Sequence, residues 1–378
     1  MRILFSQTYY LPYISGLTIY TQRLAEGLLK KGHQVTVLTS QHQKNLKKNE
    51  LKQGIRILRV PYLVKFHKGL FMPSWPLVCL DEVKKADVVI CNLPQAEGIW
   101  PVFWGKILRK KTVAIYTCEV VLPEGSVNKL VEKFLFWSNF LTCLFADKVV
   151  AYTQDYADNT QLLPRFKNKL VPILPPVALA KEDQATTRQI RKKIQKKKRE
   201  TIIGFAARIS AEKGLEYLLE ALPFLERKLY PVKLAIAGPK KEVIGEAGYF
   251  RKISSLTCQL GSKVIFLGTL LPEQMSSFYK MIDILVLPSI NSTEAFGMVQ
   301  VEAMLSGTPV VASDLPGVRM PIRLTGMGEL VPIKNPEKIA EAILKILKNK
   351  KKYLKPKHEI EKIFSFQKTI KAYEKILV

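Results

Sequence analysis

Short apolar runs alternate with segments of helical periodicity along the first part of the chain. Residues 2–7 form one such run, residues 18–31 place apolar side chains at the spacing of an amphipathic helix, and residues 34–40 form a second run. A strand, a helix and a strand in close succession are typical of a parallel βαβ unit. The pattern predicts an α/β fold with a Rossmann-like, doubly wound parallel-sheet domain over residues 1–175. Its further strands are expected at 55–60, 87–92, 112–117 and 148–153.

The same rhythm restarts at Thr201 after an interruption in composition. Residues 171–177 contain three prolines, and residues 181–200 are polar, with nine basic and three acidic side chains. We interpret 176–200 as a linker and basic segment that includes a solvated helix. A second Rossmann-like domain is expected over 201–363, and an amphipathic helix over 364–378 is expected to pack back on the first domain. Strands of the second domain are predicted at 202–208, 232–238, 263–268, 283–289 and 309–314.

The net charge narrows the choice of partners. The formal charge is +27, spread along the chain and densest in 181–200. Such a charge favours anionic partners, namely nucleic acid, anionic lipid or phosphorylated substrates. The five cysteines show no metal-ligand or disulfide spacing, which favours a reducing compartment. We find neither a signal peptide nor an apolar run long enough to span a membrane, and we therefore expect a cytoplasmic protein.

Residues 292–317 carry the most informative chemistry. Glu294 lies in the loop after the predicted strand 283–289, and the helix that follows carries Glu302. Ligands of open α/β sheets bind beyond the carboxyl ends of the strands, where unpaired N–H groups at helix N-termini can receive a phosphate. Carboxylates suit sugar and ribose hydroxyls, because they accept two hydrogen bonds at once. The expected donor-binding residues at this helix start are Phe296, Gly297, Met298 and Val299.

A second element, residues 207–214, follows the first predicted strand of the second domain. Its Arg208 and Lys213 are placed to hold a diphosphate from a neighbouring strand end. A leaving nucleoside diphosphate gains negative charge as its bond to a sugar breaks. Fixed cations there stabilise the transition state more than the ground state.

These two elements, in this order, resemble the large family 4 of retaining GT-B glycosyltransferases. The resemblance covers nearly the whole chain, including residues 11–40, the Arg208 to Gly214 element, the two glutamates seven residues apart and residues 315–332. It implies two domains facing a cleft and transfer of a sugar from a nucleoside diphosphate sugar with retention, without a cofactor. It also implies no bound metal, and no Asp-x-Asp pair occurs in the sequence.

The resemblance also implies roles for individual residues. Arg208 and Lys213 would bind the donor diphosphate, Glu294 would touch the transferred sugar, and Glu302 would bind the ribose. Gly16 would let the backbone approach the donor phosphate from the other domain, although it is also explained as a residue that ends a turn.

The chain departs from the family after the strand 112–117. Many members carry a histidine there, often followed shortly by an aspartate, whereas this segment has Thr117 at the expected histidine position and Glu119 at the acidic one. These two residues are candidates for contacts with the acceptor or the sugar. Glu119 is equally well explained as a residue that caps its own loop.

Two segments bear on a membrane partner. Residues 65–75 interleave the basic Lys65, His67 and Lys68 with the aromatic Phe66, Phe71 and Trp75. We predict that this segment docks on the anionic cytoplasmic membrane face and that the acceptor is a lipid-linked or membrane-proximal glycan. The unusually apolar segment 130–145 is better explained as a buried helix of the first domain than as a membrane-facing one.

Two rival functions remain open. One is a nucleotide-sugar epimerase of similar architecture, and the other is a basic nucleic-acid-binding protein. The net charge suits the second, but no known nucleic-acid reader motif occurs, so we do not expect a nucleic-acid partner.

Overall fold

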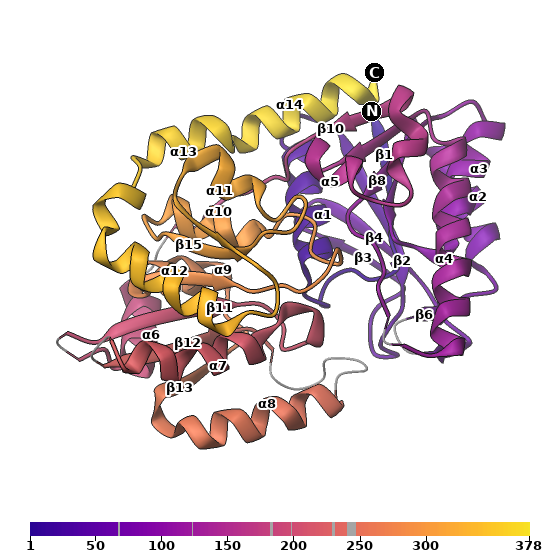
Figure 1. Cartoon of the computed structure of the whole chain (residues 1–378). Helices are drawn as coiled ribbons and strands as arrows, with labels where there is room; N and C mark the ends of the chain where they lie inside the picture. Colours follow the sequence, from indigo (N-terminus) through magenta and orange to yellow (C-terminus); the bar gives the residue numbers. More distant parts are fainter. Residues whose placement is uncertain (67–68, 123, 182–183, 198, 229–230, 240–246) are drawn as a thin grey trace. The chain divides into compact units, whose positions relative to one another are not determined.

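The chain divides into two compact units in a computed structural model that describes all residues except 67–68, 123, 182–183, 198, 229–230 and 240–246. Unit 1 comprises Met1–Pro176 together with Phe366–Val378, and unit 2 comprises Val177–Ser365 (Figure 1). Each unit is built around its own sheet.

Unit 1 is built on an eight-stranded sheet of order β10-β9-β8-β7-β1-β2-β4-β3. All neighbours pair in parallel except β3, which runs antiparallel to β4 at the edge. The strands are β1 (Arg2–Ser6), β2 (Gln34–Ser40), β3 (Asn49–Lys52), β4 (Ile55–Val60), β7 (Val88–Leu93), β8 (Lys111–Tyr116), β9 (Lys148–Ala151) and β10 (Leu170–Pro172). A separate hairpin joins β5 (Val64–Phe66) to β6 (Gly69–Phe71).

Helices cover both faces of this sheet (Figure 1). On one face, α2 (Trp75–Lys85), α3 (Ile99–Ile107) and α4 (Ser126–Phe145) lie side by side. On the other, α1 (Gly16–Leu29) packs against the final helix α14 (Phe366–Leu377). The α1 helix begins where Ser15 and Thr18 form a capping box, which satisfies two N–H groups at its start. The short helix α5 (Gln154–Asp158) follows β9.

Close packing holds α14 against α1. A Cβ at Gly27 of α1 would lie 2.2 Å from Ile370 Cδ1, so a larger residue there would force the Ile370 side chain to move. The hydroxyls of the buried Tyr20 and Tyr373 contact each other across the same interface. The final helix is thus part of the core of unit 1.

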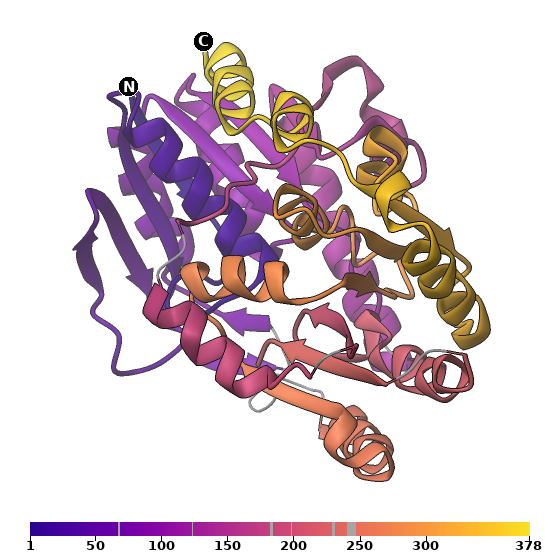
Figure 2. The same cartoon turned by 90° about the vertical axis from the view of Figure 1, so that its left-hand side faces the viewer.

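Unit 2 is built on a six-stranded parallel sheet of order β13-β12-β11-β14-β15-β16. Helices α7 (Leu215–Glu226), α8 (Ala247–Leu260) and α12 (Pro336–Lys348) form one layer, and α6 (Gln184–Ile194), α9 (Pro272–Met281) and α10 (Met298–Leu305) form the other (Figure 2). Two further helices, α11 (Met320–Thr325) and α13 (Lys357–Ile363), complete the unit. The strands are β11 (Thr201–Ala206), β12 (Val232–Ala237), β13 (Val264–Gly268), β14 (Ile284–Leu287), β15 (Val310–Ser313) and β16 (Gly328–Val331).

The segment that composition marks as a linker contributes to unit 2. Its helix α6 buries Ile190 and Ile194 and lies against α9, where the hydroxyls of Thr187 and Ser277 are 2.8 Å apart. Its lysines and arginines are mostly exposed. The two buried isoleucines are therefore enough to pack an otherwise polar helix against α9.

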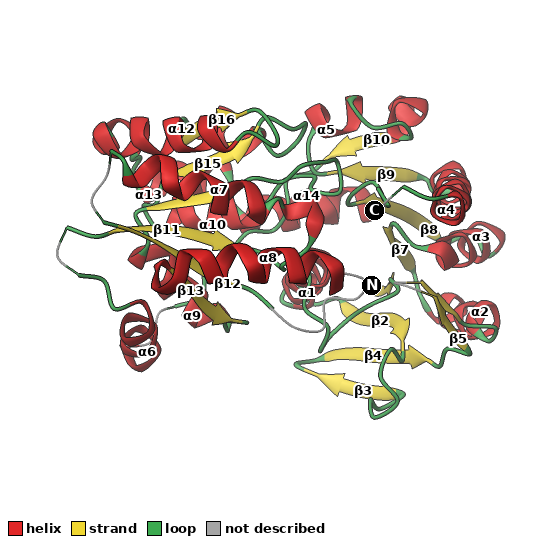
Figure 3. Cartoon of the chain, turned by 60° about the horizontal axis from the view of Figure 1, so that its bottom comes forward, coloured by secondary structure: helices red, strands yellow, loops and turns green. Residues whose placement is uncertain are grey.

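The two sheets confirm the predicted α/β class with two doubly wound parallel domains. In both units the loops after the strands gather at the carboxyl edge of the sheet (Figure 3), which is where ligands of this architecture bind. Within the described residues, no helix is both long and apolar enough to cross a membrane.

Candidate functional site

The loops after β11 and β14 come together at the carboxyl edge of the unit 2 sheet. The Ile290 N–H donates to the Glu212 carbonyl at 3.0 Å. Gly214 has φ of +62°, and a Cβ there would lie 2.2 Å from the Pro288 carbonyl oxygen. Glycine is therefore required at this position both by the backbone conformation and by the approach of the second loop.

This approach brings three of the predicted residues into one charged cluster. Lys213 Nζ lies 2.7 Å from Glu294 Oε2, and both side chains are largely buried. Arg208 Nη2 lies 3.2 Å from Glu212 Oε1. Burial raises the pKa of Glu212, but the charges of Lys213 and Arg208 outweigh it and hold that pKa below its usual range. The site therefore presents two cations, each already paired with a carboxylate.

The start of α10 adjoins Glu294 in the chain. Gly297 has φ of +75°, and a Cβ there would lie 2.4 Å from Leu287 Cδ2, so this turn also requires glycine. The helix begins at Met298, which leaves the first N–H groups without intrahelical acceptors. The ring of Phe296 is buried and packs edge-to-face against Phe364, with ring centroids 6.0 Å apart. Phe296 can therefore reach a ligand only through its backbone, whereas Met298 and Val299 are partly exposed.

Glu302 lies about one turn into α10 and is 8% exposed. Its Oε2 accepts a hydrogen bond from the hydroxyl of the fully buried Tyr279 at 2.7 Å. The contact fixes the position of a carboxylate near the start of the helix, on the same element as the N–H groups of Met298 and Val299.

Gly16 is the first residue of α1 in unit 1. A Cβ at this position would meet nothing within 4 Å, and the φ angle of Gly16 is not positive. The fold of unit 1 therefore does not require glycine here, in contrast to Gly214 and Gly297.

The two candidates after β8 are engaged in unit 1 itself. The hydroxyl of Thr117 is buried and donates to the Leu93 carbonyl at 2.6 Å. Glu119 Oε1 accepts from the Gln161 N–H at 2.8 Å, and its own N–H donates to the Tyr156 hydroxyl at 2.7 Å. These contacts favour the loop-capping interpretation of Glu119.

Sequence reasoning missed a cluster at the carboxyl edge of the first sheet. The ring centroids of Tyr9 and Tyr13 lie 5.6 and 6.0 Å from that of His42, whose pKa is lowered by burial. Burial raises the pKa of Glu97 to about 7, and its Oε2 has no hydrogen-bond partner among the described residues. These residues follow three different strands and share no motif, so only the strand order brings them to one edge.

The prediction for segment 65–75 is wrong at Trp75. This side chain is fully buried in a core cluster of unit 1 with Leu70 and Met72, so it cannot insert into a membrane. Phe71 is 62% exposed. Residues 67 and 68 lie outside the described residues, and the side chain of Phe66 is likewise not described.

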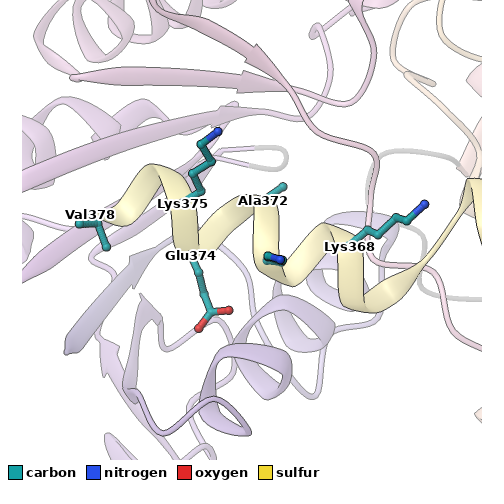
Figure 4. Close-up of a pocket in the computed structure, with 6 residues that line it drawn as sticks. Lys368, Ala372, Glu374, Lys375 and Val378 are labelled. Atoms are coloured by element: carbon teal, nitrogen blue, oxygen red, sulfur yellow. The ribbon is translucent and has the colours of Figure 1, made fainter.

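Among the described residues, neither a metal-binding group nor the surface hollow along α14 adds a residue to the candidate site. Across the described part of the chain, no group of three or more histidine, cysteine, aspartate or glutamate side chains is placed to hold a metal ion. A surface hollow of about 610 Å³ runs along α14 of unit 1 (Figure 4), and it is lined by Lys368, Lys371, Ala372, Glu374, Lys375 and Val378.

Two doubly wound domains in tandem, with cations, carboxylates and a helix start at the carboxyl edge of the second sheet, define the GT-B class of fold. The chain belongs to the group 1, family 4 glycosyltransferases. Residues 14–181 match the model of Glycosyltransferase Family 4, and residues 186–362 match that of Glycosyl transferases group 1.

Relatives and solved structures agree with this assignment. An uncharacterized glycosyltransferase of Methanocaldococcus jannaschii is 28% identical over 88% of this chain and 85% of its own length. The alpha-monoglucosyldiacylglycerol synthase of Streptococcus pneumoniae is 25% identical over 84% of this chain and 72% of its own length. The structure of HepE from Anabaena in complex with UDP-glucose superposes with a TM-score of 0.79 at 19% identity, covering 100% of this chain and 99% of that one. This last likeness concerns the fold.

Proposed function

We propose that the protein transfers a sugar from a nucleoside diphosphate sugar to an acceptor hydroxyl, with retention of anomeric configuration and without a bound metal. The observation that carries the donor site is the Lys213–Glu294 contact of 2.7 Å, which joins the two loops at the edge of the second sheet. The HepE structure that shares this fold holds UDP-glucose, which supports a nucleotide sugar as the donor class.

The chemistry of the site gives each residue a role in this proposal. Arg208 and Lys213 hold the donor diphosphate, together with the N–H groups at the start of α10. Glu302 accepts from the ribose, Glu294 accepts from hydroxyls of the transferred sugar, and Gly16 offers open backbone to a phosphate.

The pairing of both cations has a mechanistic consequence. In the free protein, Arg208 and Lys213 are neutralised by Glu212 and Glu294. When a diphosphate binds, the cations exchange part of this pairing for phosphate oxygens, and Glu294 is released toward the sugar. As the bond to the sugar breaks, charge grows on the leaving diphosphate, and the two cations stabilise that charge most strongly.

We further propose that the acceptor is a lipid-linked or membrane-proximal glycan and that the protein works at the cytoplasmic membrane face. The Streptococcus pneumoniae relative is an alpha-monoglucosyldiacylglycerol synthase, which supports an acceptor of lipid character. The formal charge of +27 supports an anionic surface as partner.

A screen of nucleotide sugars tests the proposal. The full chain is heated with each of several UDP-, GDP- and ADP-sugars, and the donor should raise the unfolding temperature by mass action. Release of free nucleoside diphosphate should then accelerate when a suitable acceptor is added. Conversion of the donor sugar into its epimer without any acceptor would instead establish the epimerase. Salt-sensitive binding of random DNA with no response to any nucleotide sugar would favour the nucleic-acid-binding alternative.

A further inference from the structure

Helix α4 of unit 1 buries several small polar residues and exposes several large apolar ones. Its buried side chains are Ser138, Asn139, Thr142 and Cys143. Its large apolar side chains that are between 48% and 69% exposed are Val127, Leu130, Phe134, Trp137 and Leu144. The spacing of three, four, three and seven residues places these five on one stripe of the helix. We call them the α4 stripe. The sequence-based expectation of a buried helix is therefore wrong for this side of α4.

Specific hydrogen bonds fix this orientation. The hydroxyl of Ser138 donates to the Ala96 carbonyl at 2.6 Å, and the Gln95 N–H donates to Asn139 Oδ1 at 3.3 Å. Both contacts serve the turn that follows β7, whose buried polar groups need partners. Rotating α4 to bury its stripe would break these bonds. The stripe is thus exposed because these hydrogen bonds hold the opposite side of the helix against unit 1.

The helix next to α4 also exposes apolar side chains. Helix α3 lies beside α4 (Figure 1) and exposes Ile107 and part of Trp100. The ring of Phe103 in α3 meets that of Phe145 in α4, with centroids 6.2 Å apart. Several large apolar side chains exposed on one side of a helix mark an interaction site, whereas single exposed apolar residues do not.

The exposed charges of helix α4 are positive. Among the exposed residues of α4, the charged ones are Lys129 and Lys133. The helix's only carboxylate, Glu132, accepts instead from the Leu122 N–H at 2.6 Å. The guanidinium of Arg165 lies over the ring of Phe136, 5.7 Å from its centroid. An exposed acidic residue, Glu124, precedes the helix. Apolar and aromatic side chains flanked by lysines suit an anionic bilayer surface.

We propose that the α4 stripe is the membrane-docking surface of the protein, with the helix lying in the plane of an anionic bilayer and Leu130, Phe134 and Trp137 entering the boundary between headgroups and acyl chains. This inference rests on the proposed function, to which it adds the surface that brings the enzyme to a membrane-held acceptor. It replaces the segment 65–75, whose Trp75 is buried.

The test uses the full chain and vesicles of phosphatidylcholine, with or without phosphatidylglycerol. The stripe variant carries Leu130→Ser, Phe134→Ser and Trp137→Ser. A matched control carries Leu51→Ser, Leu271→Ser and Ile333→Ser, three apolar residues exposed elsewhere. A third variant carries Lys129→Gln and Lys133→Gln. Thermal melts and the binding of UDP, GDP and ADP are measured on each variant, because they report folding and the donor site independently of vesicles.

The wild-type chain should sediment with the anionic vesicles and less so as salt is raised. The stripe variant should lose at least tenfold in partitioning, the lysine variant should lose severalfold, and the control should bind like wild type.

Wild-type protein that stays in the supernatant with anionic vesicles at low salt would overturn the proposal, as would a folded stripe variant that binds like wild type. So would a wild-type dimer that the stripe substitutions convert to a monomer, because the stripe would then face a second copy. Failure of UDP, GDP and ADP alike to bind any of the proteins, wild type included, would count against the proposed function and leave the vesicle result to stand by itself.

Discussion

At the scale of single residues, the two glutamates of the donor loop and helix have different surroundings. Glu294 is tied to Lys213, whereas Glu302 is held by the buried Tyr279. The first lies on the loop that would meet the sugar, and the second lies on the helix that would meet the nucleoside. Their substitution should therefore affect different steps.

Glu302→Ala should weaken the binding of free nucleoside diphosphate by about ten- to hundredfold, because a charged hydrogen bond of roughly 1.5–3 kcal/mol is lost. Glu294→Ala should leave that affinity within a few-fold, since it removes a partner of Lys213 rather than of the nucleotide, and should lower turnover more strongly. Calorimetry and steady-state rates separate the two. Tyr279→Phe is the control, because it removes the bond to Glu302 and keeps the carboxylate. Equal losses of affinity in both glutamate variants would contradict this division.

Glu97 should make the stability of unit 1 depend on pH. Burial raises its pKa to about 7, so the folded state binds a proton that the unfolded state releases at lower pH. The stability of the wild-type chain should therefore fall as the pH rises from about 4.5 to 7, by an amount on the order of 2–3 kcal/mol. Glu97→Gln should be more stable than wild type at pH 8 and similar to it at pH 5 in urea unfolding. If the two proteins instead differ in unfolding free energy by the same amount at pH 5 and pH 8, ionisation of Glu97 does not destabilise unit 1.

At the scale of elements, Gly214 and Gly16 both lie where a loop meets a helix, but they differ in how closely other atoms approach them. Gly214 has φ of +62° and is pressed against the backbone of the β14 loop, whereas Gly16 has open space around it. The first is needed by the fold. The second is needed only if a ligand approaches the backbone.

Gly214→Ala should destabilise unit 2 by about 1–3 kcal/mol, because an alanine there is strained and collides with Pro288. Gly16→Ala should keep or slightly raise the stability of unit 1, since alanine favours helix, while weakening the donor complex. Calorimetric melts and donor titrations of the two variants test the pair. A Gly16→Ala enzyme with unaltered donor affinity and turnover would remove Gly16 from the proposed site.

The same elements show how far the sequence determined the structure. The predicted strand 232–238 is observed as β12 (Val232–Ala237), and the predicted strand 34–40 is β2, because each is a short segment whose β-branched and apolar side chains are largely buried in the sheet. The edge strand β3 was not predicted, since its four residues are mostly polar and exposed. The outward stripe of α4 was not predicted either, because an apolar helix gives no sign of which side its neighbours will cover.

For the candidate site, the sequence located the loops but not all of their partners. Arg208, Lys213 and Glu294 follow strand ends, and parallel strands place such ends at one edge. The pairing of Arg208 with Glu212 depends on a turn conformation that only the structure shows. The groups around His42 come from three loops without a shared motif, so no sequence pattern predicts that they lie together.

At the scale of the whole molecule, the absence of an Asp-x-Asp pair from the sequence bears on the metal requirement. We expect transfer, or donor hydrolysis, to continue in EDTA, because in the proposed mechanism Arg208 and Lys213 would supply the positive charge that a divalent ion supplies elsewhere. Rates are measured before and after chelation. Complete loss of activity in EDTA with recovery on addition of manganese would show that a metal is essential.

The central claim is that the carboxyl edge of the second sheet binds the diphosphate of the donor. Calorimetric titration of the full chain with UDP, GDP and ADP, repeated with Arg208→Ala and with the exposed control Lys338→Ala, tests it most directly. The account predicts that at least one nucleoside diphosphate binds, that Arg208→Ala loses about tenfold or more in affinity through a missing charged contact, and that the control binds like wild type. Binding that is equally strong in Arg208→Ala, or no binding of any of the three nucleotides to the wild-type chain, would contradict it.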